Sequence, residues 1–228
     1  MKHYDSIPRI DDDGTLKSDM VWGFNKLDGQ NFCASYKPHK NIWGPFGSRN
    51  HTVDENDLQF GKTVKFFNEH KYAEILTSCV REHAKKGDVF HGIEEITFFF
   101  EWYGPNSFAG KNEIDISNEN MRLALIDVFL KKKGYIEPKD YYNIFNNCGI
   151  ELPELIYKGQ LTSEIIDKIK ANDWTKEGCC FPTVKEGVVF KRSTLMKGQR
   201  RPSVKVKTKW WLEKLHSLYS EEECKLLE

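Results

Sequence analysis

Two apolar segments constrain the fold of this chain more than any other part of its sequence. Ile93–Tyr103 contains Phe98, Phe99 and Phe100 in a row, and Arg122–Leu130 is almost as apolar. Short apolar runs rich in aromatic and β-branched residues are typical of strands. Three consecutive phenylalanines are too apolar for an exposed edge, so we expect this segment to lie inside a sheet.

The other predicted elements make the chain a mixed domain. Aromatic-rich runs at 20–24 and 31–36 flank a turn with Asp28-Gly29, which predicts two strands joined by that turn. Further strands are predicted over 42–51 (a short strand and loop), 187–192 and 203–209, and helices over 64–86, 138–148, 161–172 and 210–219, with a polar tail from 221. The expected fold class is α+β with mainly antiparallel sheets, as a single domain over 1–228.

Composition narrows the class of protein. Apolar residues make up 39% and charged residues 30% of the 228 residues, which excludes disordered and collagen-like chains. No apolar run approaches the roughly 18–20 residues of a membrane span, and the first residues lack the apolar stretch of a signal peptide. The six cysteines show neither CxxC spacing nor a ligand-like spacing with histidine. We expect free thiols in a cytoplasmic protein (host cytoplasm if the chain is phage-encoded), with no membrane partner.

The charge is balanced overall but not along the chain. Lysine and arginine number 34, as do aspartate and glutamate, so the net charge is zero. The segment 185–216 nevertheless carries ten basic and two acidic residues. A basic block in a neutral protein indicates that a polyanion contacts one face, although a solvated cationic loop would give the same pattern.

Four short motifs place lysines and carboxylates at or near the ends of predicted strands. They are Lys26-Leu27-Asp28-Gly29, Glu101-Trp102-Tyr103-Gly104, Glu186-Gly187-Val188-Val189-Phe190-Lys191 and Lys205-Val206-Lys207. Lys205 and Lys207 share one strand face, where like charges repel, so the pair suggests an anionic partner. Each motif is weak alone, because a surface turn, an edge carboxylate or a lysine-protected edge strand would look the same.

The order of the motifs is more specific than any one of them. With Ser48-Arg49-Asn50 and Ile126-Asp127 between them, they resemble the covalent nucleotidyltransferase superfamily of ATP-dependent polynucleotide ligases and mRNA capping enzymes. The resemblance spans about residues 22–209. It implies an adenylation (nucleotidyltransferase) domain with two packed antiparallel sheets, flanking helices and a cleft between the sheets.

The resemblance also implies a mechanism and a set of site residues. The family's lysine, here Lys26, attacks the α-phosphorus of ATP and forms a lysyl-AMP intermediate. We expect burial, nearby lysines and a divalent cation to depress the pKa of this amine, since an ammonium is not a nucleophile. Glu101 and Glu186 are oxygen donors suited to Mg²⁺ or Mn²⁺. The residues expected to bind the nucleotide are Asn25, Lys26, Asn31, Arg49, Glu101, Ile126, Glu186, Lys205 and Lys207.

The residue two positions after Gly29 indicates the branch of the superfamily. DNA ligases and capping enzymes usually have arginine there, whereas Asn31 is similar to RNA ligases that seal nicks in duplex RNA. The expected substrates are therefore ATP and RNA with 5′-phosphate and 3′-hydroxyl ends. Lys197, Arg200 and Arg201, between the last two strands, are candidates for RNA contact.

Two departures from the family pattern shape the remaining expectations. Ile126 stands where an aromatic residue often stacks on the purine, so adenine would rest on Ile126 or on another residue such as Phe129. Only 21 residues follow Lys207, too few for the OB-fold domain of DNA ligases and capping enzymes. We expect a monomer, which is either a minimal ligase without that domain or an isolated catalytic domain of a larger one. The alternatives are a DNA ligase, a capping guanylyltransferase that uses GTP, or a non-catalytic nucleic-acid-binding module.

Overall fold

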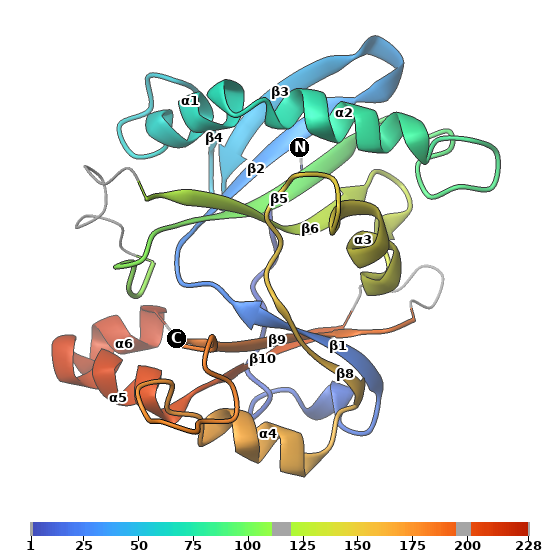
Figure 1. Ribbon diagram of the computed structural model, residues 1–228. Coiled ribbons are helices and arrows are strands. Elements are labelled where there is room, and N and C mark those ends of the chain that lie inside the picture. The colour runs from blue at the N-terminus through green and yellow to red at the C-terminus, as the bar shows by residue number, and fades with distance from the viewer. Residues whose placement is uncertain (1, 111–119, 195–201, 228) are drawn as a thin grey trace.

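The structure is a computed structural model that describes residues 2–110, 120–194 and 202–227 (Figure 1). The strands are β1 (Met20–Lys26), β2 (Gln30–Lys37), β3 (Ile42–Ser48), β4 (Thr52–Val53), β5 (Ile96–Tyr103), β6 (Arg122–Leu130), β7 (Gly134–Tyr135), β8 (Leu155–Gln160), β9 (Gly187–Arg192) and β10 (Ser203–Lys207). The α-helices are α1 (Gly61–Glu69), α2 (Tyr72–Glu82), α3 (Pro138–Phe145), α4 (Ser163–Lys170), α5 (Lys209–Leu218) and α6 (Glu221–Leu227).

The described strands form two antiparallel sheets, which we call sheet A and sheet B. Sheet A has the order β10-β9-β1-β8, and sheet B has the order β4-β3-β2-β5-β6-β7. Figure 1 shows α1 and α2 along the outer face of sheet B, and α4 along the outer face of sheet A. The predicted α+β fold, with two antiparallel sheets and flanking helices, is confirmed.

The phenylalanine-rich strand lies in the middle of sheet B, as predicted. β5 pairs with β2 on one side and with β6 on the other. Phe98 and Phe100 belong to the core under α1 and α2, where Phe100 lies 5.9 Å from the ring of Phe67. Phe99 faces the other way, with its ring centroid 4.9 Å from that of Tyr4. All three phenylalanines are fully buried because both faces of β5 are covered.

The turn after β1 carries the chain from sheet A to sheet B. β1 pairs with β8 and β9, whereas β2, the next strand along the chain, pairs with β3 and β5. A Cβ atom at Gly29 would overlap the carbonyl oxygen of Trp102 in β5. The turn therefore packs directly against sheet B, which requires glycine at this position.

The first residues of the described chain also connect the two sheets. The Tyr4 hydroxyl donates to Asp127 of β6, at 3.3 Å. Further along, the Ile10 amide donates to the carbonyl of Lys205 in β10, and the Lys205 amide donates to the carbonyl of Pro8. Residues 4–10 thus run from sheet B to sheet A.

The structure corrects the sequence-based prediction at several elements. The single helix predicted over 64–86 is two helices, because Lys71 adopts a left-handed backbone with φ of 56° between α1 and α2. The strand predicted over 203–209 ends at Lys207, and Thr208 caps α5 through its side chain. β8 was not predicted, and α6 replaces the expected polar tail. Within the described residues, no helix has the length and apolarity that crossing a bilayer requires.

Candidate active site

A cavity of about 480 Å³ lies between the two sheets, at the turn that follows β1. Both sheets contribute to its wall, as does the N-terminal segment through Tyr4, Ser6 and Ile7. Every residue that the sequence predicted for nucleotide binding lines this cavity: Asn25, Lys26, Asn31, Arg49, Glu101, Ile126, Glu186, Lys205 and Lys207. The structure therefore brings together residues that span most of the sequence, although their individual roles remain predictions.

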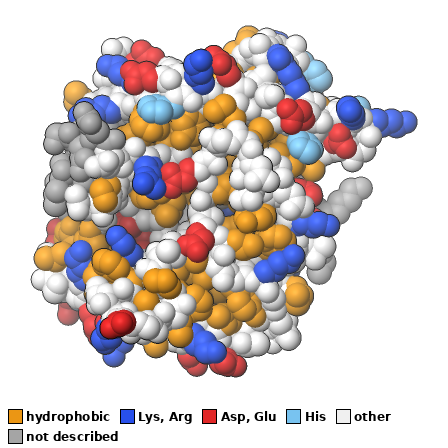
Figure 2. Space-filling model, in the orientation of Figure 1, with side chains coloured by type: hydrophobic (Ala, Val, Ile, Leu, Met, Phe, Trp, Pro, Cys, Tyr) orange, Lys and Arg blue, Asp and Glu red, His pale blue; other side chains and the backbone are white. Residues whose placement is uncertain are grey.

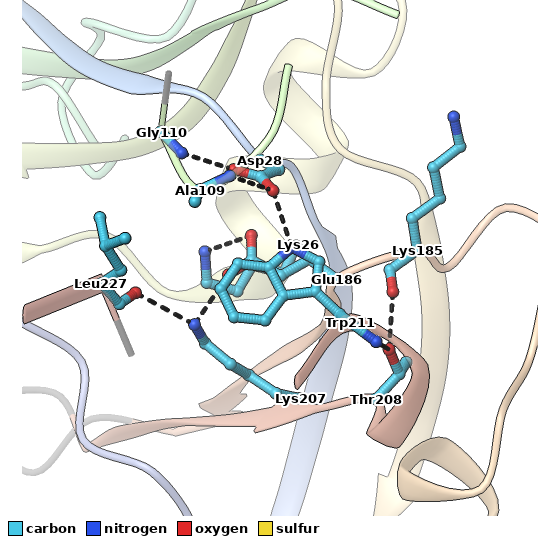
Figure 3. A network of polar contacts seen from close by, with 10 residues as sticks. All are labelled: Lys26, Asp28, Ala109, Gly110, Lys185, Glu186, Lys207, Thr208, Trp211 and Leu227. Carbon is cyan, nitrogen blue, oxygen red and sulfur yellow. Dashed lines mark hydrogen bonds and ion pairs between the residues drawn. The ribbon is translucent and has the colours of Figure 1, made fainter. Parts of the chain in front are cut away.

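One buried carboxylate holds two lysines at the centre of the site (Figure 3). Lys26 Nζ donates to Glu186 Oε2 at 2.8 Å, and Lys207 Nζ lies 3.2 Å from Glu186 Oε1. The strand register explains this arrangement, since Lys26 of β1 and Lys207 of β10 both pair with Gly187 of β9. Both oxygens of Glu186 are thus engaged by ammonium groups.

The electrostatics of the lysines differ from the sequence-based expectation. Burial lowers the pKa of Lys26, but the carboxylates of Glu186, Glu101 and Asp28 together raise it above the ordinary value. The expected depression of this pKa is therefore wrong for the protein alone, because the lysine faces carboxylates rather than cations. Burial does lower the pKa of Lys205 and that of Lys207, each to about 8.

Asp28 fixes the position of the turn through three hydrogen bonds (Figure 3). Its Oδ1 accepts from the Gly110 amide at 2.8 Å, and its Oδ2 accepts from the Ala109 amide at 2.9 Å and from Trp211 Nε1 at 2.7 Å. Lys207 Nζ lies 3.6 Å from the centroid of the same Trp211 ring. The sequence placed Asp28 in a turn and Trp211 in a predicted helix, without indicating that the two side chains meet. Their partners are remote in sequence, so no local pattern could have revealed this network.

Asn31 and Glu101 lie opposite each other on paired strands, β2 and β5. Asn31 Nδ2 donates to the Phe100 carbonyl at 3.2 Å, whereas its Oδ1 is buried and finds no partner among the described residues. Burial raises the pKa of Glu101 to about 7, and the neighbouring carboxylates of Glu186 and Asp28 add to the rise against the opposing charge of Lys26. This corner of the cavity therefore offers oxygen atoms that have few partners in the protein itself.

The carboxylate oxygens of Glu101, but not those of Glu186, are available to bind a divalent cation. Carboxylate oxygen is the donor that Mg²⁺ and Mn²⁺ prefer, and the Glu101 carboxylate makes no hydrogen bond or ion pair that the described structure shows. Glu186, in contrast, is already bound to Lys26 and Lys207. No cluster of three or more acidic, histidine or cysteine side chains within the described ranges forms a ready-made metal site. A cation here would need phosphate or water ligands in addition to Glu101.

A second buried ion pair joins the two sheets at the apolar end of the cavity. Lys191 Nζ of β9 lies 3.0 Å from Asp127 Oδ2 of β6 and donates to the Ile126 carbonyl at 2.6 Å. Lys191 is the last residue of the motif that begins at Glu186, but the sequence did not predict it as a site residue. Phe129, the alternative surface for the purine, does not line the cavity, because its ring packs 5.2 Å from that of Tyr135. Lys197, Arg200 and Arg201 lie outside the described residues.

Comparisons with known proteins agree with this geometry. The family model described as RNA ligase matches residues 19–207. No curated protein of similar sequence was found. Among solved structures, Naegleria gruberi RNA ligase with PPi matches with a TM-score of 0.60 and 16% identity, over 95% of this chain and 58% of that chain. A point variant of the same ligase with AMP and Mn matches with a TM-score of 0.59 and 18% identity, again over 95% and 58%.

The chain thus spans well under two thirds of these solved chains, and at such identities the likeness concerns the fold. The family match covers most of the sequence and includes the residues from β1 to β10 that form the cavity. This chain belongs to the RNA ligase family.

Proposed function

We propose that the protein is an ATP-dependent RNA ligase that joins a 5′-phosphate to a 3′-hydroxyl through a lysyl-AMP intermediate. The observation that carries the proposal is the position of Lys26, which lies 2.8 Å from Glu186 in a cavity that also holds Arg49, Lys205 and Lys207. A primary amine that is hydrogen-bonded to a carboxylate, in a cavity that also supplies cations for phosphate charge, suits attack on a phosphoryl group. A point variant of Naegleria gruberi RNA ligase has been solved with ATP and Mn, which supports the same ligands here.

In the first step, the Lys26 amine attacks the α-phosphorus of ATP. An N–P bond forms, the bond from the α-phosphorus to the bridging oxygen breaks, and pyrophosphate leaves. Glu186 Oε2 is the hydrogen-bond acceptor of Lys26 Nζ, so it is placed to take a proton from the amine. Lys205 and Lys207 would balance the phosphate charge. A bound divalent cation, held by Glu101, would neutralise further phosphate charge and lower the pKa of Lys26.

The next two steps transfer AMP and then release it. An oxygen of the RNA 5′-phosphate attacks the lysine-bound phosphorus, so the N–P bond breaks, Lys26 recovers its amine, and a 5′,5′-pyrophosphate linkage forms. The 3′-hydroxyl then attacks the RNA phosphorus, AMP leaves, and a phosphodiester remains. One ATP becomes AMP and pyrophosphate for each bond sealed.

The duplex nick-sealing type is supported by Asn31. Its Oδ1 is buried without a partner among the described residues, so a ligand hydroxyl would relieve an unpaired acceptor. An arginine at this position, as in DNA ligases and capping enzymes, would bring a charge into the pocket that Asn31 occupies beside Phe100. We therefore expect nicks with ribose at the 3′-hydroxyl end to be sealed faster than all-DNA nicks.

The test is covalent labelling followed by sealing. Wild-type protein should take label from α-labelled ATP and not from GTP, and Lys26→Ala should take none while keeping its fold. Lys168→Ala, an exposed lysine on α4 paired with Glu164, is the matched control and should label normally. Persistent label on Lys26→Ala would exclude this lysine as the nucleophile. Faster sealing of all-DNA nicks would favour the DNA ligase alternative.

A further inference from the structure

A second cavity, of about 700 Å³, adjoins the candidate active site. The two cavities share the wall formed by 25–28, Pro153, Glu186 and Trp211, so Lys26 borders both. The remaining lining of the second cavity comes mainly from the segment 103–108, from the other residues of 151–154, from the loops around Trp174 and Lys185, and from Trp210 and Lys214 of α5. Figure 2 shows the molecule hollowed between the halves that contain the two sheets, with Lys and Arg side chains and hydrophobic side chains on the rim.

Aromatic rings and lysines alternate around this second cavity. Lys185 Nζ lies 4.6 Å from the Trp174 ring, and Lys214 Nζ lies 4.2 Å from Phe108 and 5.3 Å from Trp210. The Trp174 and Trp210 rings meet edge to face, at 5.5 Å and 83°. Aromatic faces combined with cations are what proteins use to bind single-stranded nucleic acid, by stacking on bases and contacting phosphates.

The charges around the cavity leave these two lysines available. Lys185 and Lys214 form no ion pair that the described structure shows, and both side chains are exposed. The acidic groups of the wall are mostly engaged: Glu186 by two lysines, Asp28 by three donors, and Glu151 by Arg122 and the Tyr103 hydroxyl. Only Glu154 remains as an acidic side chain of this wall with no such contact among the described residues.

We propose that this second cavity binds a terminal nucleotide of the RNA strand to be sealed, with its base against Trp210 and Trp174 and its phosphate on Lys185 and Lys214. The proposal rests on the proposed function and extends it to the strand. The first cavity already supplies Arg49, Lys205 and Lys207 for a triphosphate, so the second set of cations is available for another phosphate. Because both cavities border Lys26, a strand end in the second one would lie beside the lysine-bound nucleotide.

The test separates binding of the strand from binding of ATP. The variants are Lys185→Glu combined with Lys214→Glu, and Trp210→Leu beside the conservative Trp210→Phe. Lys209→Glu is the control for the Lys214→Glu half of the double variant, because it makes the same charge change on α5 at a lysine that pairs with Glu213 outside this cavity. Three quantities are measured: labelling from ATP, affinity for a fluorescent RNA with a 5′-phosphate, and sealing of a pre-adenylated RNA strand without ATP.

The double lysine variant and Trp210→Leu should each weaken RNA affinity and sealing by about 10- to 100-fold, the range expected for lost stacking and phosphate contacts. Labelling from ATP should not change, Trp210→Phe should restore most of the affinity, and Lys209→Glu should match the wild type. Unchanged RNA affinity and sealing in the double lysine variant would overturn the proposal. A fall in ATP labelling in that variant would overturn it too, and would assign the cavity to the triphosphate.

The outcome for the wild type separates the two proposals. If the wild-type protein takes no label from ATP, the proposed ligase function fails, while the comparison of RNA affinities still tests the second cavity. If the wild type labels and seals but the variants do so equally well, only the second cavity fails.

Discussion

Glu101 shows that a candidate site residue can lower the stability of the protein. Burial raises the pKa of its carboxyl from the ordinary 4.5 to about 7 in the folded protein. The folded state therefore favours the protonated form, and the cost of ionising Glu101 is absent below pH 4.5 and fully present above about pH 7. Glu101→Gln removes this cost, so it should raise the free energy of unfolding at about pH 8 but much less at about pH 5. Urea unfolding of the wild type and of Glu101→Gln at both pH values measures this change in the free energy of unfolding. An equal change at the two pH values would contradict the prediction.

Lys205 and Lys207 should make nucleotide binding sensitive to alkaline pH. Burial lowers the pKa of each lysine to about 8, so the free protein loses positive charge from this site as the pH rises through that value. Affinity for ATP should fall over this range, where ordinary lysines remain charged. Lys205→Arg keeps the charge and should flatten the dependence. Equilibrium binding of a non-hydrolysable ATP analogue from about pH 7 to 9.5 measures this pH dependence for the wild type and for Lys205→Arg. Parallel curves for the two proteins would exclude a contribution from the titration of Lys205.

Asp28 stabilises the turn after β1 more than an aspartate in an exposed surface turn would. Asp28→Asn leaves a single acceptor oxygen for three donors and turns an amide group toward at least one of them. We expect a loss of about 2–4 kcal/mol in the free energy of unfolding, with weaker labelling of Lys26. Asp54→Asn is the control, because Asp54 accepts from the Asn56 amide in an exposed turn. Equal effects of the two substitutions in thermal and urea unfolding would contradict the role given to Asp28.

The elements show which parts of the fold the sequence could predict. Helix α4 was predicted over 161–172 from a local pattern, and it is present over Ser163–Lys170 with Thr162 as its N-cap, whose side chain accepts from the Ile165 amide. The break between α1 and α2 was missed because Lys71 adopts a left-handed backbone that carries no glycine signal. β8 was missed because its LIYKGQ sequence mixes apolar and polar residues that are mostly half-exposed, and it is held mainly by pairing with β1.

The same distinction holds for the candidate site. Motif order predicted which residues meet in the cavity, since most of the motifs lie at or near a strand end and the strands converge there. The engagement of Glu186 by two lysines and the anchoring of Asp28 by Trp211 depend on tertiary contacts. No spacing of residues along the sequence encodes these contacts, so the pKa of Lys26 could not be predicted from the residues next to it in the sequence.

At the scale of the molecule, the Lys191–Asp127 pair connects sheet A to sheet B. The two side chains are 4% and 0% exposed, and Asp127 also accepts from Tyr4 and from the Val128 amide. Lys191→Met leaves the Asp127 charge buried without its cation and should lower the free energy of unfolding by about 3–5 kcal/mol.

The double variant Lys191→Met with Asp127→Asn tests the reason for that loss. It removes both charges, so it should be more stable than Lys191→Met alone. A double-mutant cycle measured by urea unfolding checks the coupling, and additive losses would show that the pair contributes no specific link between the sheets.

The pairing of β1 has a consequence for folding during synthesis. Lys26 is made early, but among the described strands β1 pairs only with β8 and β9, which follow more than half of the chain length later. Most of sheet B, in contrast, consists of strands that end by Leu130 and pair with one another. On a ribosome, sheet B can therefore form while β1 waits without partners, its apolar residues exposed to chaperones. Lys26 is thus among the first residues of the candidate site to be synthesised and among the last to be enclosed.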